Sequence, residues 1–155
     1  MRAESLHAIV LLALVAGLAA SAFAGYETLN PSSEKICSIN PFVSCAKIDN
    51  SGHTTTFGVP DWVLGVAGYV ALLALDVGVY RTWRRDLLLG LTALSGLGVA
   101  FSAYLAYIEI VVIVGLCPVC LTAYLANALA FGALVGLVRQ GRSPPDPEPG
   151  PPPSG

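Results

Sequence analysis

The chain has 155 residues, of which 55% are hydrophobic and only 12% are charged, and its formal net charge at pH 7 is −2. A soluble domain usually carries about 25% charged residues, so this composition indicates a protein whose solvent is lipid. A net charge near zero gives no basis for expecting nucleic acid as a partner. The composition therefore predicts an integral membrane protein.

Four apolar stretches are long enough to cross a bilayer as helices, because about 20 apolar residues span about 30 Å of hydrocarbon. They cover approximately residues 6–25, 62–80, 87–116 and 117–138. Their composition is typical of helices in lipid. We therefore expect an all-α membrane protein, a four-transmembrane-helix bundle within residues 1–142.

The first stretch also has features of a removable signal peptide. Met1-Arg2 supplies a basic start, and Ala22-Phe23-Ala24 fits a small-residue cleavage site. However, the charge-free run is longer than a usual signal core, and Glu4 dilutes the basic start. We expect this stretch to be kept as a membrane helix.

A polar loop over residues 26–61 connects the first two stretches. It contains turn signals at Asn30-Pro31, Asn40-Pro41 and Asn50-Ser51-Gly52 but no apolar periodicity. We expect it to lie over the helix ends, with one short interfacial helix. Residues 143–155 are mostly proline, glycine and acid, which predicts a disordered tail.

The basic residues indicate the orientation of the bundle. Six of the eight fall where a four-helix topology puts one side of the membrane, namely Arg2, Arg81, Arg84, Arg85, Arg139 and Arg142. The positive-inside rule assigns that side, and with it the tail, to the cytoplasm. The loop and all four cysteines then face the extracytoplasmic side, where disulfides can form and persist.

The four cysteines fall into two pairs, Cys37 with Cys45 in the loop and Cys117 with Cys120 at the outer start of the fourth stretch. Residues three apart share a helical face, and a helix N-terminus favours a thiolate. Pro118 suits a first-turn position.

Three interpretations of these cysteines compete. They are static disulfides, a four-cysteine zinc site, and a redox relay with one pair on a loop and the other on a helix. Zinc fits poorly because only one pair has finger-like spacing, so no metal is expected. The placement favours the relay.

Two polar residues of the fourth stretch, Tyr124 and Asn127, lie on the same helical stripe as Cys117 and Cys120. Polar groups in lipid normally face the bundle interior. They either join helices by hydrogen bonds or line a cavity below the thiols. For Tyr124 we favour a cavity, in which its phenol donates to the carbonyl of an electron acceptor, and for Asn127 both roles stay open.

Two acids lie within the apolar stretches. For Asp76, near Arg81 and Arg84 in sequence, we expect pairing with arginine or extension to the interface. Glu109 raises the hypothesis of a proton route to a reduced quinone, because an intramembrane acid is a functional candidate. The roles of Glu109 and of His53 in the loop stay open.

The cysteine pattern resembles the vitamin K epoxide reductase family over approximately residues 6–138. Cys37 and Cys45 match its loop cysteines, and Cys117-Pro118-Val119-Cys120 matches its active pair. Further matches are Ser51 with a loop serine or threonine, Phe57-Gly58 with the stretch before the second helix, and Tyr124 with a quinone-contacting tyrosine. Thr54 stands where human-type members carry asparagine, a departure that bears on vitamin K epoxide as a substrate.

The resemblance implies a membrane thiol-disulfide oxidoreductase. A thioredoxin-like partner, expected as a separate chain, would reduce the loop pair by attacking Cys37. Cys45 would then attack Cys117, and Cys120 would pass electrons to a menaquinone, ubiquinone or vitamin K type quinone. Supporting residues would be Ser51 for the loop and Tyr124, Phe57, Thr54 and Asn127 for the quinone. Alternatives are reduction of vitamin K epoxide and a non-enzymatic membrane subunit stapled by disulfides.

Overall fold

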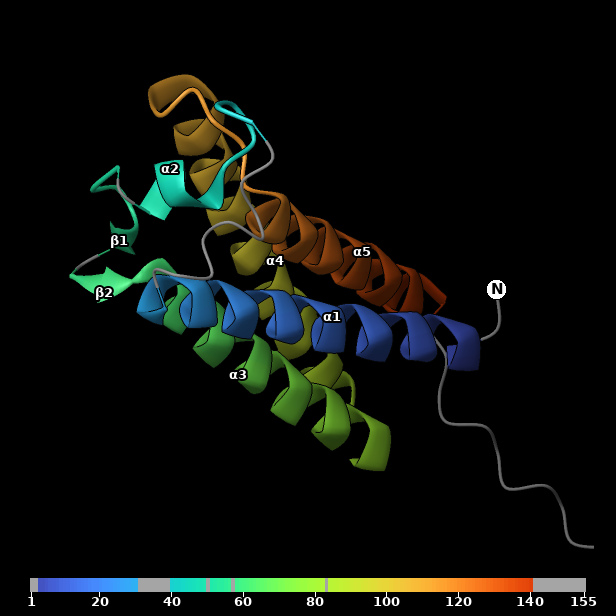
Figure 1. The fold of residues 1–155 in the computed structure, drawn as a ribbon. Coiled ribbons are helices and arrows are strands. Elements are labelled where there is room, and N and C mark those ends of the chain that lie inside the picture. The colour runs from blue at the N-terminus through green and yellow to red at the C-terminus, as the bar shows by residue number, and fades with distance from the viewer. Residues whose placement is uncertain (1–2, 31–39, 50, 57, 83, 141–155) are drawn as a thin grey trace, which may run out of the picture.

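A computed structural model describes residues 3–30, 40–49, 51–56, 58–82 and 84–140. Four long helices form the bundle, namely α1 (Ala3–Leu29), α3 (Asp61–Thr82), α4 (Arg85–Tyr107) and α5 (Pro118–Gln140) (Figure 1). A π-helical turn, η2 (Ile108–Val112), continues α4. Four helical spans, Glu4–Leu29, Asp61–Thr82, Arg85–Val112 and Pro118–Gln140, are long and apolar enough to cross a membrane. The predicted four-helix membrane fold is confirmed.

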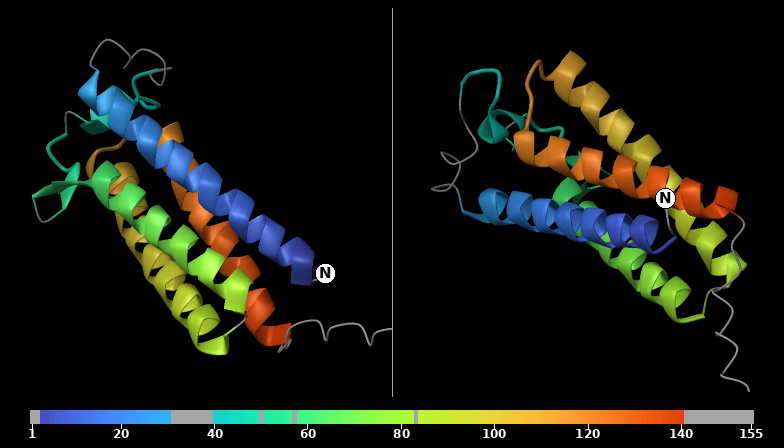
Figure 2. Two further views of the ribbon diagram at one scale, coloured as in Figure 1. Left: turned by 90° about the horizontal axis from the view of Figure 1, so that it is seen from below. Right: turned by 90° about the vertical axis from the view of Figure 1, so that its right-hand side faces the viewer.

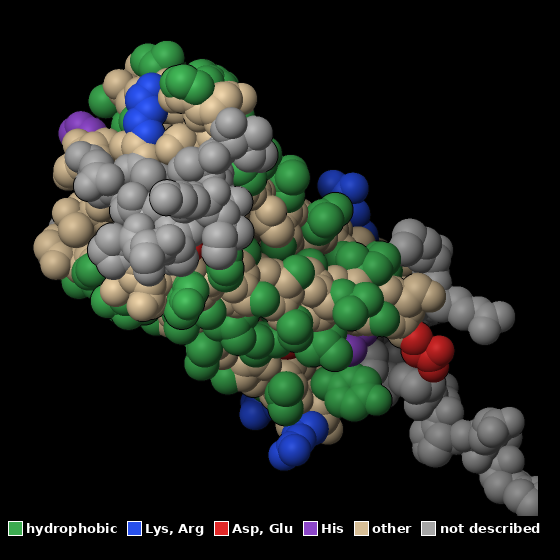
Figure 3. Space-filling view, viewed as in Figure 1, with side chains coloured by type: hydrophobic (Ala, Val, Ile, Leu, Met, Phe, Trp, Pro, Cys, Tyr) green, Lys and Arg blue, Asp and Glu red, His purple; other side chains and the backbone are tan. Residues whose placement is uncertain are grey.

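The helices pack so that α1 and α4 each contact both α3 and α5. The interior contains fully buried Leu14, Leu91 and Leu134. Many large apolar side chains, such as Leu12, point outward, and apolar side chains cover the flank of the bundle seen in Figure 3. Since lipid replaces water on this flank, core and surface are both apolar, and close helix contact depends on small residues.

Glycines bring α1 against α3. A Cβ on Gly17 would lie 2.1 Å from Cζ of Tyr69, and one on Gly25 would lie 2.6 Å from Cε3 of Trp62. Tyr69 then reaches α5, where its hydroxyl donates a hydrogen bond to the Ala123 carbonyl over 2.6 Å. One aromatic side chain thus joins three helices.

The third helical span ends at Val112, so the prediction of a helix to residue 116 is wrong in its last turn. The Gly115 N–H donates to the Glu109 carbonyl over 2.9 Å, and Val114 has a left-handed φ of 52°. A β-branched residue rarely adopts this conformation. Lys47 stabilises it by donating its Nζ to the Val114 carbonyl over 2.7 Å. The sequence does not reveal where the helix ends, because the residues of the turn are as apolar as those of the helix before it.

The loop contains the predicted short helix, α2 (Cys45–Asp49), and a small hairpin that was not predicted. The hairpin pairs β1 (Thr55–Thr56) with β2 (Val59–Pro60), antiparallel, with Thr55 opposite Pro60. Two-residue strands leave no alternating pattern in the sequence. Helix and hairpin lie together at one end of the bundle (Figure 2).

Backbone hydrogen bonds join the loop to the turn before α5. Leu116 donates to the Phe42 carbonyl over 2.8 Å and accepts from the Ser44 N–H over 3.2 Å. Val43 and Leu116 form an isolated parallel bridge. These bonds fix the position of α2 relative to the start of α5.

Asp76 lies against α1, and not beside an arginine as we had expected. It is 1% exposed, and its Oδ1 is 3.6 Å from Nδ1 of His7. The His7 ring stacks on Tyr80 with centroids 5.1 Å apart. Arg84 instead lies near exposed Asp86, 3.9 Å away. The contact between Asp76 and His7 thus joins α3 to α1.

The close contact of α1 with α3 predicts that Gly17→Ala destabilises the bundle. The added methyl would overlap the Tyr69 ring, and overpacking costs about 1–3 kcal/mol. We expect the thermal midpoint in detergent to fall by several degrees, as followed by helical circular dichroism.

Gly132→Ala is the matched control, since a Cβ there meets no atom within 4 Å. It should leave the midpoint unchanged or slightly higher. Equal midpoints for the two variants would contradict the packing described here.

Candidate functional site

Two cysteines far apart in sequence meet above the bundle. Cys45 is the first residue of α2, and Cys117 lies directly before α5. Their Sγ atoms are 3.2 Å apart, and the two residues are only 5% and 3% exposed. Cys117 and Cys120 are free thiols, whereas Cys37 lies outside the described residues. The fold therefore brings a loop cysteine into reach of the helix-borne pair.

The start of α5 positions the Cys117–Cys120 pair. Pro118 is the first helical residue, and the Cys120 N–H donates to Cys117 Sγ over 3.2 Å. The Leu121 N–H donates to the Cys117 carbonyl over 2.9 Å. The Cys117 sulfur thus caps the helix, where the helix dipole favours negative charge.

Cys120 faces a cavity of about 210 Å³. Its wall combines all four long helices with the loop, and Cys117 is not part of it. Gly65, Gly68 and Ala123 line it on the α3 and α5 sides with small side chains. Pockets for drug-sized ligands measure about 300–1,000 Å³, so this cavity suits a small ring system better than a whole long-tailed molecule.

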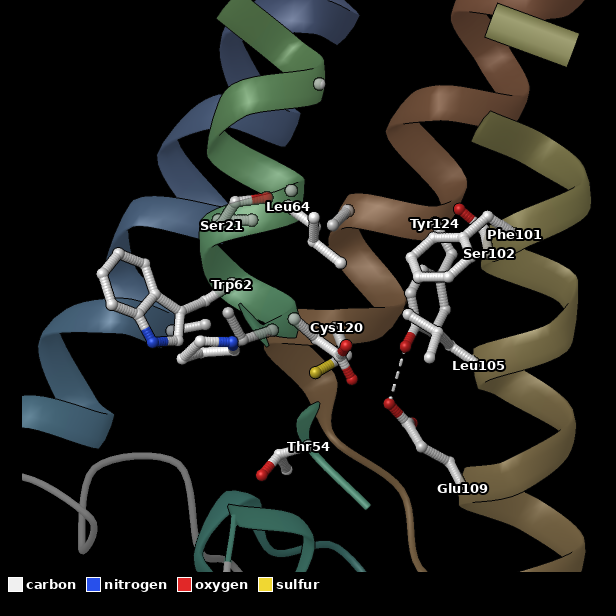
Figure 4. Close-up of a pocket in the computed structure, with 18 of the residues that line it drawn as sticks. Ser21, Thr54, Trp62, Leu64, Phe101, Ser102, Leu105, Glu109, Cys120 and Tyr124 are labelled. Atoms are coloured by element: carbon white, nitrogen blue, oxygen red, sulfur yellow. Dashed lines mark hydrogen bonds between the residues drawn. The ribbon is translucent and has the colours of Figure 1, made fainter. Parts of the chain in front are cut away.

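Glu109 and Tyr124 form a hydrogen-bonded pair on the cavity wall. The Tyr124 hydroxyl donates to Glu109 Oε1 over 2.8 Å (Figure 4). Glu109 Oε2 is 3.5 Å from the Cys117 N–H, and the Cys120 thiol also interacts with this carboxylate. Tyr124 therefore lies at the predicted cavity, but its hydroxyl is engaged by a carboxylate.

The sequence left the role of Glu109 open, with a proton route to quinone as one hypothesis, and the structure places this residue beside the thiols and the cavity. The signal that singled it out in the sequence is an acid within an apolar span. Its side chain reaches Cys117 and Cys120 because η2 and the following turn fold the chain back onto α5. Sequence spacing alone does not reveal that path.

The loop contributes the outer wall of the cavity. Thr54 lines it, together with His53, Asp61 and Trp62. The Asp61 N–H donates to the Thr54 carbonyl over 2.9 Å, which fixes Thr54 over the start of α3. Asp61 and Trp62 were missed as site residues, although both stand at the recognisable start of a helix. Phe57 lies outside the described residues.

Ser51 lies in the turn after α2. Its hydroxyl donates to the Ile48 carbonyl over 2.6 Å and accepts from the His53 N–H over 3.2 Å. These two bonds shape the loop between α2 and β1.

Asn127 lies on the cavity wall and also joins two helices. Its Oδ1 accepts a hydrogen bond from the Ser95 hydroxyl of α4 over 3.2 Å. Its Nδ2 would lie 2.6 Å from a Cβ on Gly98. The two roles left open for this residue are therefore compatible.

Within the ranges that the structure describes, no group of three or more His, Cys, Asp or Glu side chains could hold a metal ion.

The site thus combines adjacent thiols, a buried carboxylate and an apolar cavity inside a membrane bundle. The sequence model of the Vitamin K epoxide reductase family matches residues 8–135. That range contains all four cysteines and every cavity residue named above. Since the match covers most of the chain, this integral membrane protein belongs to the Vitamin K epoxide reductase family, whose members are membrane oxidoreductases that couple thiol–disulfide and quinone chemistry.

Proposed function

We propose that the protein is a quinone-dependent thiol oxidase that generates disulfides in a separate thioredoxin-like partner. Electrons pass from the partner to Cys37 and Cys45, then to Cys117 and Cys120, and finally to a membrane quinone. The observation that carries this proposal is the 3.2 Å contact between Cys45 and Cys117. It joins the loop that carries Cys45 to a helix whose second cysteine faces the cavity.

The relay begins at the loop. A partner thiolate attacks Cys37 of a Cys37–Cys45 disulfide and releases Cys45 as a thiolate. The partner's second thiolate then attacks the mixed disulfide, which leaves an oxidised partner and two loop thiols.

The second exchange passes the electrons to α5. Cys45 attacks Cys117 of a Cys117–Cys120 disulfide, and Cys120 leaves as a thiolate. Cys37 then attacks Cys45, which restores the loop disulfide and leaves two thiols at the start of α5.

A quinone ring in the cavity would accept these electrons from the Cys120 side. The cavity has mostly apolar walls with a few polar groups, as small-molecule sites usually do. Menaquinone, ubiquinone and vitamin K all contain a 1,4-quinone ring. The quinone supplies the redox chemistry, while the protein orients it and excludes water.

The orientation of the protein follows from charge. Among the described residues, Arg81, Arg84, Arg85 and Arg139 lie at the end of the bundle opposite α2, where α3 and α5 end. By the positive-inside rule this end faces the cytoplasm. The cysteines and their partner would then be extracytoplasmic, in a compartment that permits disulfides.

Transfer to quinone predicts that Cys120→Ala abolishes quinone reduction. Anaerobic mixing of thiol-reduced wild-type protein with a short-chain quinone should give rapid, stoichiometric loss of quinone absorbance. The variant should give none, because no dithiol remains beside the cavity. Absence of quinone loss in the reduced wild-type protein would refute the proposal.

The contact between Cys45 and Cys117 predicts a trapped mixed disulfide. In Cys37→Ala/Cys120→Ala, mild oxidation should join the two remaining cysteines, as measured by protection from alkylation in mass spectrometry. The matched control, Cys45→Ala/Cys120→Ala, retains Cys37 and Cys117 and should be alkylated faster. Equal protection of the two variants would argue against the proposed route.

Cavity occupancy predicts that Gly68→Leu weakens quinone use. A Cβ at Gly68 meets no atom within 4 Å, so the larger side chain can enter the cavity without displacing backbone. We expect a KM for short-chain quinone about tenfold higher, from steady-state kinetics. Gly132→Leu adds the same side chain in equally open space outside the cavity and should leave the KM unchanged. An unchanged KM in Gly68→Leu would place the quinone elsewhere.

A further inference from the structure

Glu109 is a buried carboxylate within a membrane span. It is 6% exposed, and no lysine, arginine or histidine among the described residues forms an ion pair with it. Burying a charge without a cation is costly, and more so where lipid replaces water. An acid kept at such a position requires a functional explanation.

The polar contacts of Glu109 lead to the reacting groups. One oxygen accepts the Tyr124 hydroxyl at 2.8 Å, and the other faces the Cys117 N–H at 3.5 Å. The Cys120 thiol interacts with the same carboxylate. Glu109, Cys120 and Tyr124 all line the cavity. The carboxylate therefore lies between a thiol that must lose a proton and a phenol that faces the quinone space.

The π-helical turn keeps the acid in this place. Ile110, Val111 and Val112 follow Glu109 and are exposed, whereas Glu109 is buried. The Ile113 N–H donates to the Ile108 carbonyl over 2.9 Å, which closes the wider turn. Such turns occur frequently at functional sites.

We infer that Glu109 is a catalytic residue that carries the protons of the Cys120 and Cys117 thiols to the quinone, the first of them through Tyr124. This inference rests on the proposed function. Oxidation of two thiols by a quinone must move two electrons and two protons. The disulfide holds neither proton, so both must reach the quinone oxygens.

The first half of the reaction uses the relay. The Glu109 carboxylate takes the proton of the Cys120 thiol, and the Cys120 sulfur forms a bond to a ring carbon of the quinone. The electron pair of the ring double bond moves to a carbonyl oxygen. Glu109, now protonated, donates to the Tyr124 oxygen, and the Tyr124 hydroxyl proton passes to that quinone oxygen.

The second half forms the disulfide. The Cys117 thiol gives its proton to Glu109, and the Cys117 thiolate attacks the Cys120 sulfur. The sulfur–sulfur bond forms while the carbon–sulfur bond breaks, and its electron pair returns to the ring. The second quinone oxygen takes the proton that Glu109 carried, which yields the quinol and restores the carboxylate.

The test is anaerobic mixing of fully reduced protein with a short-chain quinone, using Glu109→Gln and Glu109→Asp. Glutamine keeps the shape and can still accept from Tyr124, but it does not take a proton. We expect Glu109→Gln to reduce quinone about 100-fold more slowly, as for loss of a general acid–base group. The KM for quinone should not change, and Glu109→Asp should recover part of the rate.

A buried acid outside the cavity supplies the matched control. Asp76→Asn removes a carboxylate that is 1% exposed and does not line the cavity, and it should reduce quinone at the wild-type rate. The Cys45–Cys117 exchange, measured by alkylation, should proceed normally in Glu109→Gln, because that step needs no quinone.

A double variant separates a relay from a structural role. If Glu109 and Tyr124 act in one proton path, Glu109→Gln/Tyr124→Phe should be no slower than the slower single variant. Multiplied losses would overturn the relay.

The failures are distinguishable. A wild-type rate of quinone reduction in Glu109→Gln would overturn the inference and leave the thiol oxidase intact. The same holds if Glu109→Gln both raises the KM for quinone and slows the Cys45–Cys117 exchange, since that result indicates a structural role. Failure of the wild-type protein to reduce any quinone would remove the proposed function and this inference together.

Discussion

The site depends on the attachment of the polar loop to the turn before α5. A loop of this kind has few apolar side chains to bury, so ordering it must be offset by specific bonds. Leu116 forms backbone hydrogen bonds with Phe42 and Ser44. Lys47 donates a hydrogen bond to the carbonyl of Val114, the residue in the left-handed conformation. Together they bring Cys45 to 3.2 Å from Cys117. Without this attachment the two cysteine pairs would be independent.

Polar side chains inside a membrane bundle are energetically costly, so their positions indicate where they serve packing or function. In lipid, a polar side chain is favourable only where it finds a partner inside the bundle. Asn127 has Ser95 as its partner, and Glu109 has Tyr124. The first pair joins α4 to α5 below the thiols, while the second lies beside them. The same requirement for partners thus stabilises the bundle and places a proton-accepting group at the cavity.

The parts of the site that could be predicted are those encoded locally. Cys117 and Cys120 share a helical face by their spacing, and Tyr124 follows on the same stripe, so their common side was evident from the chain. Glu109 was recognised as an acid in an apolar span with a proton route to quinone as one hypothesis, but its approach to Cys117 could not be foreseen, because it requires the π-helical turn and the left-handed Val114. The pairing of Asp76 with His7 was missed for a related reason, since the two residues lie on different helices.

The sequence by itself determined the four membrane spans, except for the end of the third, and the family, because span length, hydropathy and cysteine spacing are properties of local sequence. Only the tertiary structure decided that Cys45 contacts Cys117 and that Cys120 faces a cavity while Cys117 does not. It also decided that Glu109 lies beside Cys117 and on the wall of the cavity. The physical reason is that lipid-facing and core-facing residues are equally apolar in this bundle. Helix rotation and loop position are therefore set by glycine contacts, buried hydrogen bonds and one strained turn, which have no periodic pattern in the sequence.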